Sequence, residues 1–230
     1  MLNLQQLEVG YGESMVLRDV NLTVKSNQVV CLMGRNGVGK TTLLKAIIGI
    51  LSPKSGSIHF QENDILKQRP SGRALNGISY VPQGREIFPK LTVYENLLIG
   101  LEANKKKQSI SEEVYEYFPI LKSFAKRNGG DLSGGQQQQL AIARALVADP
   151  SFLLLDEPTE GIQPNIVEDI QNVIRKIKEN SNTSMLLVEQ NLDFAKSVAD
   201  YIYVMDHGQI VYESDVESVV DEEVYKYLSV

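Results

Sequence analysis

Apolar and polar residues alternate along this chain in segments that predict strands and helices in turn. Residues 2–9 and 20–24 alternate apolar with polar positions, which predicts two half-buried strands around a turn-like segment at 10–14. Further strands are predicted at 29–33, at the end of S-P-K-S-G-S-I-H-F, and at 78–81, 152–155 and 185–188. Apolar residues at helical spacing predict helices at 43–51, 91–101, 111–124 and 165–179. A short helix, a strand pair around D-H-G-Q-I-V and a helix ending at Tyr227 and Leu228 follow. This order predicts an α/β fold.

Composition narrows the class of protein. The chain has 230 residues, 43% of them hydrophobic, which allows one large domain or two lobes sharing a core. No stretch approaches the roughly 20 apolar residues that span a bilayer, and M-L-N-L-Q-Q-L-E lacks the pattern of a signal peptide, so we expect a cytoplasmic protein. The net charge of −6 argues against nucleic acid as a partner and against direct binding to anionic lipid. The one cysteine, Cys31, lies in the strand at 29–33 and is expected to be buried.

A glycine-rich turn follows that strand and precedes an apolar helix. Gly34, Gly39, Lys40 and Thr41 match G-x-x-x-x-G-K-[ST], in which backbone N–H groups surround phosphate oxygens at a helix N-terminus. Lys40 is expected to reach the β- and γ-phosphates, and the Thr41 hydroxyl to bind Mg²⁺. A chance match in a strand–loop–helix unit is the alternative, and the flanking strand and helix argue against it.

Acidic and amide side chains end two of the predicted strands. Asp156 and Glu157 follow the strand at 152–155, and ligands bind at the carboxyl ends of parallel strands. We expect Asp156 to hold Mg²⁺ through water and Glu157 to act as general base towards the attacking water. Gln83, at the exit of strand 78–81, is either a ligand of Mg²⁺ or its water, or a plain loop residue. Tyr11 either covers a sheet edge or stacks on a nucleotide base, which is worth about 1–3 kcal/mol.

A second anion site is predicted at G-G-D-L-S-G-G-Q-Q-Q-Q-L. Ser133 can cap the helix that follows, while Gly134 and Gly135 leave N–H groups at its positive end. The alternatives are a well-capped helix and a phosphate site that serves another subunit.

These motifs, in this order and spacing, resemble the ATP-binding subunits of ABC transporters over essentially the whole chain. The resemblance implies a P-loop ATPase core, a mixed sheet with helices on both faces, from residues 1–83 and 148–230. It also implies an N-terminal antiparallel β subdomain and an inserted α-helical subdomain at 84–147. Two chains of such proteins pair head to tail around two ATP molecules.

The resemblance assigns the site as follows. It implies that ATP is bound by Tyr11, by the loop residues Gly34, Arg35, Asn36, Gly37, Val38, Gly39, Lys40, Thr41 and Thr42, and, from the paired chain, by Ser133, Gly134, Gly135 and Gln136. Thr41, Gln83 and Asp156 are the implied contacts of Mg²⁺. Glu157, Gln83 and Gln190 are the expected catalytic side chains, with Gln190 near the γ-phosphate.

Within this family, the chain resembles the branch that imports branched-chain amino acids, amides and urea, and most of all the second ATP-binding subunit of urea importers. The stretches that carry this are C-L-M-G-R-N-G-V-G-K-T-T-L-L-K, Y-V-P-Q-G-R-E-I-F-P, D-L-S-G-G-Q-Q-Q-Q-L-A-I-A-R-A-L and L-D-E-P-T-E-G-I-Q-P. In the amino-acid branch the position of Gln83 is often glutamate, so urea ranks above branched-chain amino acids as the predicted cargo.

Partners and location follow from the same resemblance. It implies transmembrane permease subunits, a sibling ATPase subunit in a heterodimer with a homodimer as the alternative, and indirectly a periplasmic substrate-binding protein. The chain would then lie on the inner face of the cell membrane, held there by the permease.

Two positions depart from the wider family. Gln163 replaces the usual aspartate, and Gln190 replaces the usual histidine, while His59 and His207 lie elsewhere. ATP binding is therefore more secure than hydrolysis, and a module that uses ATP only as a dimerisation clamp stays an alternative. A non-transport ATPase of translation or repair is another, although such proteins usually carry two cassettes or long insertions.

Overall fold

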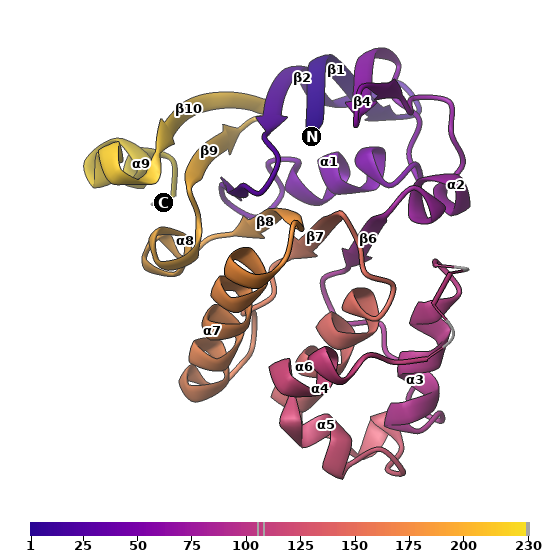
Figure 1. Ribbon diagram of the computed structural model, residues 1–230. Coiled ribbons are helices and arrows are strands. Elements are labelled where there is room, and N and C mark those ends of the chain that lie inside the picture. Colours follow the sequence, from indigo (N-terminus) through magenta and orange to yellow (C-terminus); the bar gives the residue numbers. More distant parts are fainter. Residues whose placement is uncertain (105, 108, 229–230) are drawn as a thin grey trace.

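The computed structural model of the protein describes residues 1–104, 106–107 and 109–228, and two sheets dominate it (Figure 1). The first is four-stranded and antiparallel, in the order β2-β1-β4-β5: Ser14–Val24, Leu2–Tyr11, Ser55–Phe60 and Asn63–Asp64. The second is six-stranded, in the order β10-β9-β3-β8-β7-β6: Gln209–Asp215, Tyr201–Asp206, Val29–Met33, Ser184–Glu189, Phe152–Asp156 and Ile78–Val81. Only β10 runs antiparallel in it, so the predicted mixed sheet is confirmed.

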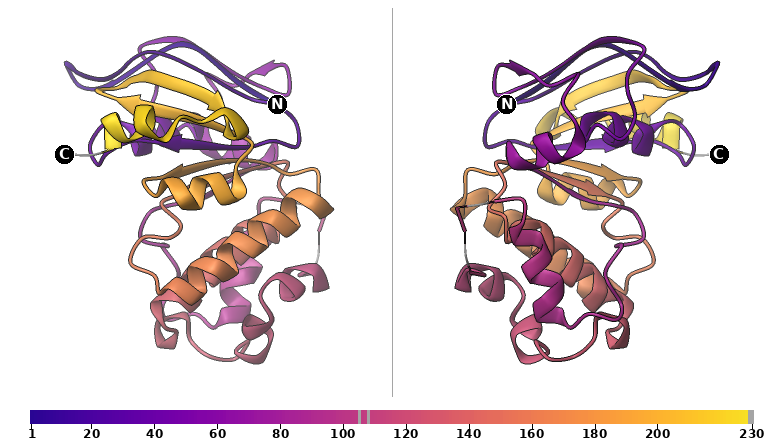
Figure 2. Two further views of the ribbon diagram at one scale, coloured as in Figure 1. Left: turned by 90° about the vertical axis from the view of Figure 1, so that its left-hand side faces the viewer. Right: turned by 90° about the vertical axis from the view of Figure 1, so that its right-hand side faces the viewer.

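Helices cover both faces of the six-stranded sheet (Figure 2). Helix α1 (Lys40–Ile47) packs between this sheet and the antiparallel one. On the other face lie α6 (Gly134–Leu146), α7 (Pro164–Asn180) and α8 (Leu192–Val198). The remaining helices are α2 (Pro70–Leu75), α3 (Val93–Leu101), α4 (Glu112–Tyr117), α5 (Pro119–Ser123) and α9 (Asp221–Leu228). The helices α3 to α6 fall within 84–147, and those subdomain boundaries stay a prediction.

Strand β3 stands between two hydrophobic cores. Val30 and Leu32 pack with α1 and the antiparallel sheet, whereas Val29, Cys31 and Met33 pack with the helices on the other face. Successive side chains of a strand point to opposite faces, so a strand covered on both faces is apolar throughout. This explains the unbroken apolar run of β3, and the buried Cys31 is confirmed.

The single helix predicted at 111–124 is wrong. The segment forms two short helices, α4 and α5, that meet at Phe118 with φ −133° and ψ 72°. The following Pro119 has no N–H to donate, and its ring disfavours the helical conformation of the residue before it, so α4 ends there. Helix α2 is a further element that the sequence pattern does not predict.

Register places three chain segments at one edge of the sheet. Met33 on β3 lies opposite Glu189 on β8, and Val188 lies opposite Asp156 on β7. Because parallel strands end at the same edge, the loops after β3, β7 and β8 leave the sheet together.

Among the described residues, none of the helices combines the length and apolar character required to cross a bilayer.

Candidate functional site

The loop between β3 and α1 depends on glycine. Gly34, with φ 152°, leaves no room for a Cβ, which would overlap the Met205 carbonyl oxygen. Gly39, at the N-cap of α1, has φ 117°, and a Cβ there would lie 2.7 Å from Leu17 Cδ2. Gly37 also has a positive φ, of 82°, with open space around it. Only glycine adopts these conformations freely, and the resulting turn lets backbone N–H groups face one point at the helix N-terminus.

The side chain of Lys40 is buried and donates hydrogen bonds to the backbone of this loop. The residue is only 5% exposed, and its Nζ donates to the backbone oxygens of Gly34 at 2.6 Å and Arg35 at 2.8 Å. The same nitrogen lies 3.5 Å from Glu157 Oε1. Burial lowers the pKa of Lys40, and the carboxylate of Glu157 opposes that shift. A buried ammonium with carbonyl partners and one carboxylate is suited to receive a further anion.

Asp156 lies at the end of β7 beside Thr41. Thr41 Oγ1 donates to Asp156 Oδ1 at 3.3 Å, and Tyr80 Oη donates to Oδ2 at 3.1 Å. Burial raises the pKa of Asp156, and these two hydrogen bonds oppose the shift. No group of three or more histidine, cysteine or acidic side chains in the described ranges could hold a metal ion by itself. A hydroxyl and one carboxylate suit Mg²⁺, which usually takes one or two protein oxygens together with substrate phosphates.

Glu157 is held by two amides from distant segments. Gln83 Nε2 donates to Glu157 Oε2 at 3.2 Å, and Gln190 Nε2 donates to Oε1 at 2.9 Å. Gln190 Nε2 also donates to Asn36 Oδ1 at 2.9 Å. The backbone of Glu157 has φ 47°, which costs a non-glycine residue about 1–3 kcal/mol and is common at functional sites. The structure therefore brings together the three side chains expected to be catalytic.

These groups surround a cavity of about 260 Å³ that is open to solvent. Its lining consists of Asn36, Gly37, Gly39, Lys40, Thr41, Thr42, Gln83 and Glu157. Left-handed glycines, an ammonium and a hydroxyl next to a carboxylate are the donors that a Mg²⁺-bound phosphate chain requires. The residues present thus fit a nucleotide with its metal ion.

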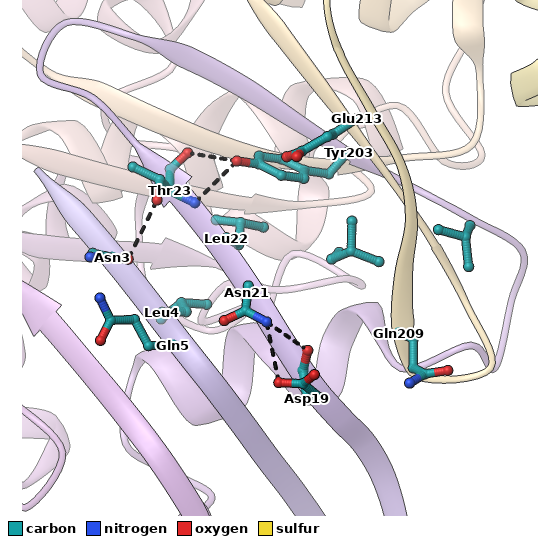
Figure 3. A pocket seen from close by; sticks show the side chains of 12 residues that line it. Asn3, Leu4, Gln5, Asp19, Asn21, Leu22, Thr23, Tyr203, Gln209 and Glu213 are labelled. Carbon is teal, nitrogen blue, oxygen red and sulfur yellow. Dashed lines mark hydrogen bonds between the residues drawn. The ribbon is translucent and has the colours of Figure 1, made fainter.

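A larger pocket, of about 700 Å³, lies elsewhere (Figure 3). It opens between β2 and β10, and its lining side chains include two carboxylates, Asp19 and Glu213, but neither lysine nor arginine. Tyr203 Oη at its wall accepts from the Thr23 N–H at 3.2 Å. Without cations or a glycine turn, this pocket is a poor site for phosphate.

The remaining predicted binding residues lie outside the 260 Å³ cavity. Tyr11 ends β1 and is 49% exposed, so its ring is free to stack on a base, and that role stays a prediction. Ser133 caps α6 as expected: its Oγ accepts from the Gln136 N–H, and Gln136 Oε1 accepts from the Ser133 N–H. None of the residues 133–136 lines the cavity that contains Lys40. This separation is what a site serving a second chain requires.

Sequence reasoning missed four polar residues of the site. Tyr80 donates to Asp156, and Glu160 Oε2 accepts from Gln83 Nε2 at 2.8 Å. Thr159 and Glu189 are hydrogen-bonded to each other. Thr159 and Glu160 stand inside D-E-P-T-E, directly after the acidic pair, and that proximity was the available signal.

Comparisons with known proteins agree with this geometry. A family model described as "ABC transporter" matches residues 17–160. The chain is 36% identical to a probable branched-chain amino acid transport ATP-binding protein of Archaeoglobus fulgidus, over 99% of this chain and 98% of that one. It is 39% identical to a high-affinity branched-chain amino acid transport ATP-binding protein of Pseudomonas aeruginosa, over 92% of this chain and 91% of that one. A lipopolysaccharide export system ATP-binding protein of Haemophilus influenzae is 37% identical over 98% of this chain and 95% of that one.

A solved structure is similar over nearly the whole fold. It is a dimeric ATP-binding cassette in a post-hydrolysis state, bound to ADP and Pi. It aligns with a TM-score of 0.84 and 26% identity, and the alignment covers 95% of this chain and all of that one.

Proposed function

The chain belongs to the ABC transporter family of ATP-binding subunits, and we propose on that basis that it powers the import of branched-chain amino acids through membrane-embedded permease subunits. It is an ATPase that uses ATP with Mg²⁺. The observation that carries the proposal is the joint presence of the phosphate loop, the Asp156–Glu157 pair and the two amino-acid transport relatives.

The residues of the cavity divide the work of hydrolysis. The loop N–H groups and Lys40 bind the phosphate oxygens and neutralise their charge, while Thr41 and Asp156 hold the metal ion. When bound, Mg²⁺ withdraws charge from the phosphate oxygens. Glu157 takes a proton from the attacking water, and Gln190 holds the Glu157 carboxylate in place. The side-chain nitrogen of Gln83 donates to Glu157, so the amide oxygen of Gln83 points away from that carboxylate.

The N-terminus of α6 serves the ATP bound by a second chain. The Ser133 hydroxyl accepts from the backbone N–H of Gln136, and the Gln136 side chain accepts from the backbone N–H of Ser133, so the N–H groups of Gly134 and Gly135 are the donors left for an anion. A sibling ATPase subunit is the proposed partner in a head-to-tail pair, with a second copy as the alternative. Residues 133–136 do not line the chain's own cavity, so the phosphate that they bind comes from the ATP of the paired chain.

A groove lined by α2, β6, α3 and α6 is the proposed docking surface of the permease. It has a volume of about 370 Å³, and its rim includes Phe88 at 44% and Ile99 at 39% exposure. Arg144 lines it, and its buried Nη1 has no hydrogen-bond partner among the described residues. Its Nη2 donates to the Arg85 backbone oxygen at 3.3 Å, which leaves Nη1 as the buried nitrogen without an acceptor in the part of the chain that the structure describes. A buried N–H donor without an acceptor is costly, so a permease segment that brings apolar side chains and an oxygen acceptor suits this groove. Such docking would hold the chain at the inner face of the membrane.

Branched-chain amino acids are the cargo on which two lines of support agree. The sequence stretches around the motifs favour the amino-acid, amide and urea branch, while the three relatives above are named for branched-chain amino acids or lipopolysaccharide. Branched-chain amino acids belong to both sets. The urea expected from Gln83 and its neighbours stays a prediction, because none of those three relatives is named for urea.

Uptake measurements test the proposal. A strain lacking this chain is complemented with the wild type or with Lys40→Ala, and uptake of labelled leucine and labelled urea is measured. We expect only the wild type to restore leucine uptake, with urea uptake unchanged throughout. Urea uptake that follows the wild-type gene instead would move the cargo to urea, and no dependence of either would refute import of both.

A further inference from the structure

Glu189 is a buried carboxylate that the roles above leave unused. It ends β8, directly before Gln190, and is 3% exposed. Its Oε1 accepts two hydrogen bonds from Thr159, one from the backbone N–H at 3.2 Å and one from Oγ1 at 2.6 Å. Its Oε2 accepts from the Gln190 N–H at 3.2 Å. Neither oxygen forms an ion pair with a lysine or arginine in the part of the chain that the structure describes.

The three donors belong to the two segments that present the catalytic side chains. Thr159 lies two residues after Glu157, and Gln190 carries the amide that donates to Glu157 Oε1. One carboxylate therefore connects the turn after β7 to the residue after β8. Glu157 lies inside this connection, with its own N–H bonded to the Val188 oxygen at 3.0 Å and its φ at 47°.

We propose that Glu189 is a positioning residue for hydrolysis: by holding Thr159 and Gln190 together, it fixes the Glu157 carboxylate and the Gln190 amide against each other. The inference rests on the proposed roles of Glu157 and Gln190. A residue held in an unfavourable conformation keeps it only where its surroundings leave no alternative, and the bonds to Thr159 supply that restraint on one side of Glu157. Glu189 itself stays out of the cavity that receives the nucleotide.

The first test replaces Glu189 by Gln in the assembled transporter. Glutamine keeps the size of the side chain, but one of its two ends becomes an N–H donor that would face either Thr159 or the Gln190 N–H. We expect kcat to fall about tenfold to a hundredfold, as for a lost hydrogen bond to a charged group, while the affinity for ATP changes less than about threefold.

A matched pair at the partner residue is Thr159→Val, which removes the hydroxyl, and Thr159→Ser, which retains it. Thr159→Val should lose about tenfold in kcat and Thr159→Ser should stay near wild type.

A second arm separates positioning from plain loss of structure. In the Glu157→Gln background, adding Glu189→Gln should lower kcat by less than about threefold, because a residue that acts through Glu157 has little left to position. Equal loss in both backgrounds would overturn the inference, as would a wild-type kcat for Glu189→Gln. A parallel fall of kcat, ATP affinity and unfolding midpoint would also overturn it, since the residue would then serve the fold alone. Wild-type turnover by Glu157→Gln itself would refute the proposed general base, whatever Glu189 does.

Discussion

Replacing Glu157 by Gln should slow ATP hydrolysis and strengthen ATP binding. The substitution keeps the shape of the side chain and removes one negative charge 3.5 Å from Lys40 Nζ. Loss of a general base slows the reaction by about 10²–10⁴-fold. The same change frees Lys40 for phosphate, because the ammonium is no longer shared with a carboxylate.

The gain in affinity can be sized from that distance. Two unit charges 3.5 Å apart attract by about 5 kcal/mol at an effective dielectric constant of about 20, before the cost of removing them from water. Desolvation offsets much of this attraction, so only part of it is available to a new anion. If about a third is recovered, ATP should bind roughly tenfold more tightly, since a tenfold change is about 1.4 kcal/mol.

The assay combines equilibrium titration of ATP with single-turnover hydrolysis on the same protein. Glu179→Gln is the matched control, because it removes the same charge from an exposed carboxylate near the end of α7 that forms no ion pair with Lys40. We expect the control to change both quantities by less than about threefold. Weaker ATP binding by Glu157→Gln would refute the competition for Lys40, and an unchanged rate would refute the general base.

Three further outcomes check the site. Gln190→Ala should slow hydrolysis about tenfold to a hundredfold by removing the donor to Glu157, whereas Gln190→His should keep substantial activity and gain a pH dependence between about 6 and 8; steady-state ATPase against pH measures both. Ser133→Arg should abolish hydrolysis in the assembled transporter and leave ATP binding by the isolated chain unchanged, and an equal loss of affinity would contradict a site shared between chains. Gly39→Ala should abolish ATP binding in an equilibrium titration, because its Cβ would meet Leu17 Cδ2 at 2.7 Å and its φ of 117° is unfavourable; wild-type affinity would show that the loop tolerates a side chain.

Local signals predict much of the fold. The buried strand at 29–33 and the glycine turn after it are predicted correctly, because the apolar run and the required left-handed residues are both adjacent in sequence. The capped start of α6 at Ser133 follows from the same kind of local rule. The error at 111–124 has a local cause too: Pro119 stands in the segment, but the apolar spacing outweighs it in the prediction.

The connections within the site cannot be predicted in this way. Thr159 and Glu189 are separated by a whole helix, and they meet because β7 and β8 pair in one register. Gln83 and Glu160 likewise meet from two different loops, those after β6 and β7. A shift of one residue in strand pairing would turn the side chains to the opposite face, and no pattern within either segment specifies that register. The motifs therefore name the groups of the site, and the sheet decides which groups touch.

The single buried cysteine makes this chain convenient for labelling experiments. Burial raises the pKa of the Cys31 thiol well above its usual value, so the thiolate that attacks a maleimide is scarce there. A new cysteine at an exposed position, such as Tyr94→Cys on α3, should then react selectively without prior removal of Cys31. One fluorophore at that helix would report in real time whether α3 shifts as ATP binds and is hydrolysed.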